Sequence, residues 1–214
     1  MHVACGYQIL SHVGAQLLLS DKRCDVNLLD DLRRTALMTA VSWVLSVDDE
    51  HAQTVRLLLA DPRTDINKQN DNGETVLYLV CDLYSKQRMH LSDLTMLLQE
   101  DELRINIINH WNESALSMFV KRKATRPEFS SHRNVLDVVK QLLSHRADPN
   151  VPAHLLAWAV NFCPLDVCRE LLHHGADPNS AFTNTEVSID QHGGRDCASL
   201  RHTAQFYQQI AVAT

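Results

Sequence analysis

The chain has 214 residues, of which 45% are hydrophobic, and a formal net charge of −6. This apolar content suits a packed core and excludes a disordered chain, and the acidic balance argues against nucleic acid as the main partner. No apolar run approaches the roughly 18 residues of a membrane span, and "MHVACGYQIL" at the N-terminus lacks the basic cluster of a secretory signal. Six cysteines without the spacing of a disulfide framework indicate reduced thiols, so we expect a cytoplasmic protein, with the nucleus as the alternative compartment.

A leucine-rich phrase that ends in asparagine recurs along the chain. It reads "LLLSDKRCDVN" at 17–27, "LLLADPRTDIN" at 57–67, "MLLQEDELRIN" at 96–106, "QLLSHRADPN" at 141–150 and "ELLHHGADPN" at 170–179. The closing asparagines are 40, 39, 44 and 29 residues apart. Eight residues after each of the first three comes a hydroxyl residue, namely Thr35, Thr75 and Ser114. Because the two signals recur in phase, the sequence predicts an array of structural repeats.

Each repeat is predicted to hold two helices. The hydroxyl residues suit the N-cap of the first helix, where a side-chain oxygen accepts a hydrogen bond from an unpaired backbone N–H. The leucine-rich phrase forms the second helix, in which Val55, Leu58 and Leu59 recur at helical spacing and give one buried face. Asp65 and Asn67, which follow this helix, are predicted to stabilise the turn by bonding nearby backbone groups. One helix pair cannot bury its own apolar faces, but a stack of pairs can.

These phrases resemble the ankyrin repeat family. "NDNGETVLYLV" carries Asn70, Gly73, Thr75 and Leu77 at positions of the family motif, "ELLHHGADPN" matches its closing phrase almost fully, and "MHVAC" fits its first helix. The resemblance covers roughly residues 1–182. It implies an all-α ankyrin-repeat solenoid of stacked helix–turn–helix units with short hairpin turns. It also implies that the hairpins and first helices line a concave surface for another protein.

Two departures from the family pattern affect the expected contacts. The motif histidine, which helps to tie neighbouring repeats in the family, is replaced by Met38, Tyr78 and Ser117, so the resemblance does not carry those ties over to this chain. The turn glycine is replaced by Arg33 and Asn112. Asparagine tolerates a left-handed backbone conformation, whereas arginine adopts it less readily.

The resemblance divides the chain into six segments. These are a partial repeat (1–29), a repeat (30–69), a repeat with an insert between its helices (70–108), a repeat with a long basic insert (109–152), a shortened repeat without a full hairpin (153–182) and a degenerate C-terminal cap or tail (183–214). Because the first segment starts inside a helix, we expect the chain to be a fragment of a larger chain or part of a complex.

The resemblance implies that residues beside the hairpin turns meet the partner protein. These are Leu32, Arg33, Arg34, Asn72, Glu74, Trp111 and Glu113. Trp111 is the expected anchor, because tryptophan is enriched among the residues that dominate binding energy. The family also implies a modification, since its closing asparagine, eight residues after a leucine, is a substrate of asparaginyl hydroxylases. Asn67 and Asn106 fit that spacing.

Alternative functions rest on weaker signals. The insert "KRKATRPEFSSHR" at 121–133 is a solvated loop or, with Lys121, Arg122, Lys123 and Arg126, a contact for an acidic surface or nucleic acid. An inhibitory or substrate-recruiting subunit of an enzyme complex, such as a ubiquitin ligase, is a further alternative, although the sequence shows no ligase-docking box.

Catalytic and metal motifs are also missing from the sequence. The chain has no nucleophile elbow, phosphate loop or dinucleotide motif, so we expect neither enzymatic activity nor a cofactor. Cys163, Cys168, His173 and His174 lack the spacing of a zinc site. The two cysteines are therefore predicted to be small core residues.

Overall fold

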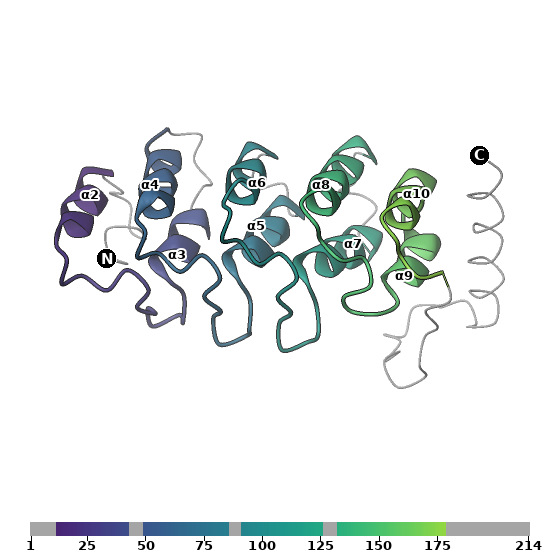
Figure 1. The fold of residues 1–214 in the computed structure, drawn as a ribbon, viewed down its shortest axis with the longest axis horizontal. Coiled ribbons are helices and arrows are strands. Elements are labelled where there is room, and N and C mark those ends of the chain that lie inside the picture. The colour runs from purple at the N-terminus through teal and green to yellow at the C-terminus, as the bar shows by residue number, and fades with distance from the viewer. Residues whose placement is uncertain (1–11, 43–48, 86–90, 126–131, 179–214) are drawn as a thin grey trace. The chain divides into compact units, whose positions relative to one another are not determined.

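The computed structural model describes residues 12–42, 49–85, 91–125 and 132–178 (Figure 1). Within these four ranges every regular element is an α-helix, as predicted. The helices are α2 (His12–Ser20), α3 (Ala36–Ser42), α4 (Asp49–Ala60), α5 (Val76–Ser85), α6 (Leu91–Leu98), α7 (Ala115–Thr125), α8 (His132–Ser144), α9 (Leu155–Phe162) and α10 (Leu165–His173). None of the described helices has the length and apolar character needed to cross a membrane.

Two compact units divide the chain, unit 1 from Met1 to Ala115 and unit 2 from Leu116 to Thr214. In unit 1, α3 packs against α4 and α5 packs against α6, which are the predicted helix pairs. Neighbouring pairs also touch, since α2 packs against α4 and α3 against α5. Figure 1 shows α2, α4 and α6 in one layer of unit 1, with α3 and α5 in a second layer. The repeat boundaries within the two units remain predictions.

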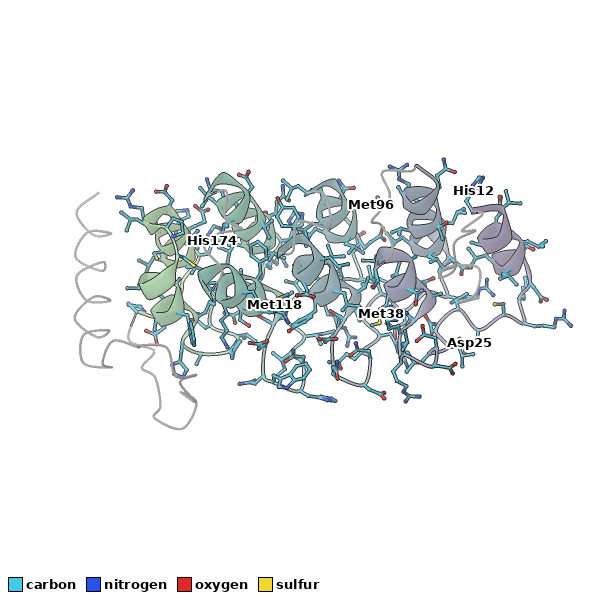
Figure 2. All side chains as sticks on the ribbon, turned by 180° about the vertical axis from the view of Figure 1, so that it is seen from behind. His12, Asp25, Met38, Met96, Met118 and His174 are labelled. Atoms are coloured by element: carbon cyan, nitrogen blue, oxygen red, sulfur yellow. The ribbon has the colours of Figure 1, made fainter. Side chains whose placement is uncertain are left out.

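The N-caps that the sequence predicted are present in unit 1. The Thr35 hydroxyl accepts a hydrogen bond from the Met38 N–H at 3.1 Å, and the Thr75 hydroxyl accepts one from the Tyr78 N–H at 3.4 Å. Each threonine therefore satisfies one of the unpaired N–H groups at the start of α3 or α5. Met38, labelled in Figure 2, lies one turn into α3 and is buried.

Unit 2 contains the shortened repeat. Here α10 packs against both α8 and α9, around the buried side chains of Leu142, Leu155 and Leu171. Only residues 151–154 separate Asn150 from α9, and His154 takes a left-handed conformation directly before that helix. A segment of this length replaces the hairpin, as the sequence predicted. The predicted cap or tail at 183–214 lies outside the described residues.

Candidate functional site

Three hairpin loops with one common design lie in a row along one edge of unit 1 (Figure 1). We call loop A residues 28–34, loop B residues 68–74 and loop C residues 107–113, and together they form the hairpin row. Asp30, Asn70 and Asn109 occupy the same position in the three loops. In each, the side-chain Oδ1 accepts the N–H groups two and four residues later, at 2.7–3.0 Å. One acceptor therefore fixes each turn from within.

The turn position that is glycine in the family is left-handed in all three loops. Its φ angle is 59° at Arg33, 75° at Gly73 and 58° at Asn112. In loop B there is a second constraint, because a Cβ on Gly73 would lie 2.9 Å from His110 Cδ2 and 3.0 Å from Asn109 Cα. Loop B thus presses directly against loop C, and the arginine of loop A accepts the backbone strain that glycine avoids.

The loops are also tied to one another by polar contacts. Arg33 of loop A forms an ion pair with Asp71 of loop B, with 2.7 Å between Nε and Oδ2. The His110 N–H of loop C donates to the Asn72 carbonyl of loop B at 3.0 Å. Gln69 Nε2 donates to the Ile108 carbonyl, also at 3.0 Å. These contacts hold the hairpin row as one surface.

A second set of ties comes from three of the asparagines that close the leucine-rich phrases, Asn27, Asn67 and Asn150. In each, Nδ2 donates to one main-chain carbonyl of the following repeat, and Oδ1 accepts the N–H two residues beyond, with all distances between 2.7 and 2.9 Å. The contacts join Asn27 to Arg63 and Asp65, Asn67 to Glu102 and Arg104, and Asn150 to Gly175 and Asp177. The sequence predicted that Asp65 and Asn67 both stabilise their own turn. This is right for Asp65, whose Oδ1 accepts the Asn67 N–H at 2.9 Å. It is wrong for the Asn67 side chain, which binds the next repeat.

At the position of the motif histidine, one tie between a first helix and the next hairpin loop is present. Tyr78, which replaces that histidine in one repeat, donates its hydroxyl hydrogen to Glu113 Oε2 at 3.1 Å. The tyrosine side chain, which is longer than that of histidine, reaches from α5 to loop C. The tie from first helix to next hairpin therefore survives in a different chemical form.

The seven residues that the sequence predicted for partner binding all lie on the hairpin row, but they differ in exposure. Leu32 and Trp111 sit at equivalent positions of loops A and C and are 69% and 58% exposed. Arg34 is tied to Asp30 of its own loop at 3.4 Å, and its Nε is buried without a described partner. Glu74 Oε2 accepts hydrogen bonds from the side chains of Asn70 and Asn72. Leu28 and Ile108 are also exposed, at 60% and 41%, so the exposed large apolar side chains of the row lie on loops A and C.

Sequence reasoning missed two residues of the hairpin row, Asp71 and Ile108, and the buried Tyr78 of α5 that contacts the row. Asp71 and Tyr78 form ties that depend on partners 38 and 35 residues away, and no local pattern marks them. Ile108 is exposed beside Trp111 in loop C. The sequence marks Ile108 only as an apolar residue directly before a predicted turn.

The other predicted sites are not residues of the hairpin row, and some of them fall outside the described residues. In unit 2, Lys121 Nζ lies 6.0 Å from the centroid of the Trp158 ring, a cation–π distance. Arg122 is exposed, whereas the Lys123 side chain and Arg126 fall outside the described residues. Asn106 is exposed, and Asn67 is held in its tie to the next repeat.

Histidines and cysteines of unit 2 do not gather into a metal site among the residues that the structure describes. Burial raises the pKa of the Cys163 thiol to about 12 and that of Cys168 to about 11. Both thiols are therefore protonated at neutral pH and poor metal ligands. His174 Nδ1 lies 3.0 Å from the Glu170 carbonyl oxygen of its own helix.

Comparison with protein families gives one match, which falls in unit 2. Residues 152–181 match the model of the ankyrin repeat. The chain carries an ankyrin repeat. This match overlaps the shortened repeat that the sequence predicted at 153–182. Unit 1 lies outside the match, and its helix pairs and hairpin loops are described by the structure alone. Ankyrin repeats typically mediate protein binding, so the match supports a protein-interaction module. Comparison with curated proteins finds no match.

Proposed function

We propose that the chain is a scaffold or adaptor that binds another protein through the hairpin row of unit 1. The supporting observation is the exposure of Leu32 and Trp111 on loops that are fixed by internal hydrogen bonds and by ties to their neighbours. A large aromatic side chain held rigidly in solvent loses little conformational entropy when a partner covers it. Such residues are typical anchors of protein interfaces.

Polar residues of the hairpin row would orient the bound partner by hydrogen bonds and ion pairs. Arg33 is half exposed in its ion pair with Asp71, so we expect it to position loops A and B and to offer its remaining donors to a partner. Asn72, Glu74 and Glu113 line the same surface and supply amide and carboxylate groups. Arg34 is expected to contribute through the shape of loop A, because it is paired within that loop.

The test is a binding measurement with the full chain and a partner identified by affinity capture. Trp111→Ala should weaken that partner roughly thirtyfold, which corresponds to about 2 kcal/mol. Leu32→Ala should weaken it less, since the side chain is smaller. Leu165→Ala is the matched control, because Leu165 is an exposed leucine of α10 outside the hairpin row. All variants should keep the wild-type melting curve.

Two results would replace this proposal. If Trp111→Ala and Leu32→Ala bind like the wild type, the hairpin row is not the interface. If neutralising Lys121, Arg122 and Lys123 abolishes binding while Trp111→Ala has no effect, the basic insert is the binding element for an acidic surface or nucleic acid. A partner that is an enzyme, with activity inhibited or redirected by the chain, would favour the role of a regulatory or substrate-recruiting subunit.

Asn67 and Asn106 remain proposed sites of hydroxylation. They share the leucine spacing of modified family members, and Asn106 is exposed. Peptide mass spectrometry of chain treated with an asparaginyl hydroxylase should show one added oxygen at these positions and none at Asn70, which has Pro62 eight residues before it.

A further inference from the structure

Arg63 locks the second repeat of unit 1 onto the end of α2. Its Nη2 donates to the Leu19 carbonyl at 2.7 Å, and its Nη1 lies 3.4 Å from the carbonyl oxygens of Asp21 and Cys24. Asp61 holds the guanidinium in place through contacts of 3.0 Å to Nε and 2.6 Å to Nη2. The last carbonyls of a helix and the loop after it have no partner within the helix, so one arginine here satisfies several of them.

Arg23 repeats this arrangement forty residues earlier. Among the described residues, however, its guanidinium has no hydrogen bond to the end of a helix. Asp21 contacts its Nε at 3.0 Å and its Nη2 at 2.7 Å, the same pattern as in the Asp61–Arg63 pair. The Arg23 side chain is 91% exposed, and Asp21 is its sole hydrogen-bond partner among the described residues. The guanidinium is thus held in the orientation that grips a helix end, with its remaining donors facing solvent.

The apolar surface of α2 points to the same occupant. Val13 and Leu17 lie one turn apart on this helix and are 59% and 71% exposed. Leu57 of α4 is the residue equivalent to Leu17 of α2. Leu57 is partly buried, and α4 packs against α2. The exposed face of α2 therefore has the character of a contact between neighbouring helix pairs.

Charge at this site favours a neutral acceptor over an anion. The hydrogen bond from Arg23 lowers the pKa of Asp21, so the carboxylate stays ionised at neutral pH and neutralises the guanidinium. A phosphate or carboxylate ligand would be repelled by Asp21, whereas main-chain carbonyls carry only partial charge. The partial negative charge at the C-terminus of a helix suits the free donors.

We propose that Val13, Leu17 and Arg23 form a docking face for the C-terminal turn of a helix from a partner protein built of stacked helix pairs. Arg23 would bind the last carbonyls of that helix, as Arg63 binds those of α2. Val13 and Leu17 would cover its apolar side. This face lies on α2 and is separate from the hairpin row, so it provides a second interaction surface.

A consensus ankyrin-repeat array without its C-terminal capping repeat is a suitable probe, because its last helix pair presents an uncovered apolar face and free carbonyls. The same array with its cap is the matched probe. Binding of both to the full chain is measured by calorimetry. We expect the uncapped array to bind, the capped array not to bind, and both Arg23→Ala and Leu17→Glu to weaken binding at least tenfold. Lys22→Ala, an exposed cation beside Arg23, should bind as the wild type does, and so should Trp111→Ala on the hairpin row.

Three outcomes would overturn the proposal. The first is a lack of binding to the uncapped array. The second is equal binding of the two arrays, or an equal loss in Lys22→Ala and Arg23→Ala, which would indicate nonspecific contact. The third is self-association of the full chain in analytical ultracentrifugation that Leu17→Glu abolishes, because the occupant would then be a second copy of this chain.

Discussion

At the scale of single residues, Gly73 shows how a neighbour limits the choice of side chain. The same turn position holds Arg33 in loop A and Asn112 in loop C, and all three residues are left-handed. In loop B, atoms of His110 and Asn109 of loop C lie 2.9–3.0 Å from the place where a Cβ would stand. The backbone conformation thus tolerates other residues at this position, while the close approach of loop C does not.

Gly73→Ala should therefore destabilise the protein more than a left-handed alanine does elsewhere. A left-handed conformation costs an L-residue about 1–2 kcal/mol, and the contact with His110 and Asn109 adds to this. Gly175→Ala is the control, because Gly175 has a φ of 86° and no atom within 4 Å of its Cβ position. Urea unfolding of both variants gives the comparison, and equal losses would contradict the close approach.

Asp61 makes the contact between Arg63 and the end of α2 sensitive to acid. The hydrogen bond from Arg63 holds the pKa of Asp61 below its ordinary value of 3.8. Because the folded-state pKa is the lower one, this carboxylate adds stability above the unfolded pKa and loses it as the pH falls through the folded pKa. Asp61→Asn should lower stability at pH 7 and flatten the acid limb of the stability curve below about pH 4. Urea unfolding as a function of pH measures both, and an unchanged acid limb would show that the ion pair contributes nothing.

At the scale of an element, α4 shows how well the spacing of apolar residues predicts the buried face of a helix. The spacing of Val55, Leu58 and Leu59 predicted one buried face, and Leu58 is fully buried and Val55 nearly so. Leu59 is only partly buried, while Thr54, which the pattern left out, is buried. The face is rotated slightly from the predicted one because α4 packs against both α2 and α3.

Leu58→Ala should lower the free energy of unfolding by about 2–5 kcal/mol, since it leaves a cavity in a packed core. Leu59→Ala, one position further along the same helix, should cost clearly less. Denaturant melts followed by circular dichroism report both changes. Overlapping melts of Leu58→Ala and wild type would mean that the assigned face of α4 is wrong.

At the scale of the whole molecule, each compact unit buries at least one thiol. Burial raises the pKa of Cys81 in unit 1 to about 12, and the pKa values of Cys163 and Cys168 in unit 2 are raised for the same reason. Thiols held in the protonated form are poor nucleophiles. The two units therefore share a sensitivity to alkaline solution, where an unfolded chain would ionise these groups.

Stability should fall as the pH rises above about 9, the ordinary pKa of a cysteine thiol. A raised folded-state pKa gives stability that is complete below the unfolded pKa and is lost as the pH climbs towards the folded pKa. Each buried thiol contributes a loss of roughly 1.4 kcal/mol per pH unit in that window. Chemical unfolding between pH 8 and pH 11 measures the loss, and Cys81→Ala should reduce it. An identical slope in that variant would rule out ionisation of Cys81 as a cause.

The sequence by itself determined the features that depend on neighbours along the chain. The N-caps at Thr35 and Thr75 and the burial of Leu58 follow from helical spacing and turn chemistry. These are local signals, because the groups that interact lie within one turn or one short loop. The repeated phrases then sufficed to predict helix pairs and their contacts.

Only the tertiary structure decided how polar side chains tie one repeat to the next. Asn67 binds the main chain at Glu102, Arg33 pairs with Asp71, and the hydroxyl of Tyr78 reaches Glu113. The partners lie 35, 38 and 35 residues away along the chain, so each contact depends on which groups the folded backbone brings within about 3 Å. The exposure of Leu32 and Trp111 has the same origin, because a residue at a hairpin tip is covered only if a neighbouring loop extends far enough to reach it.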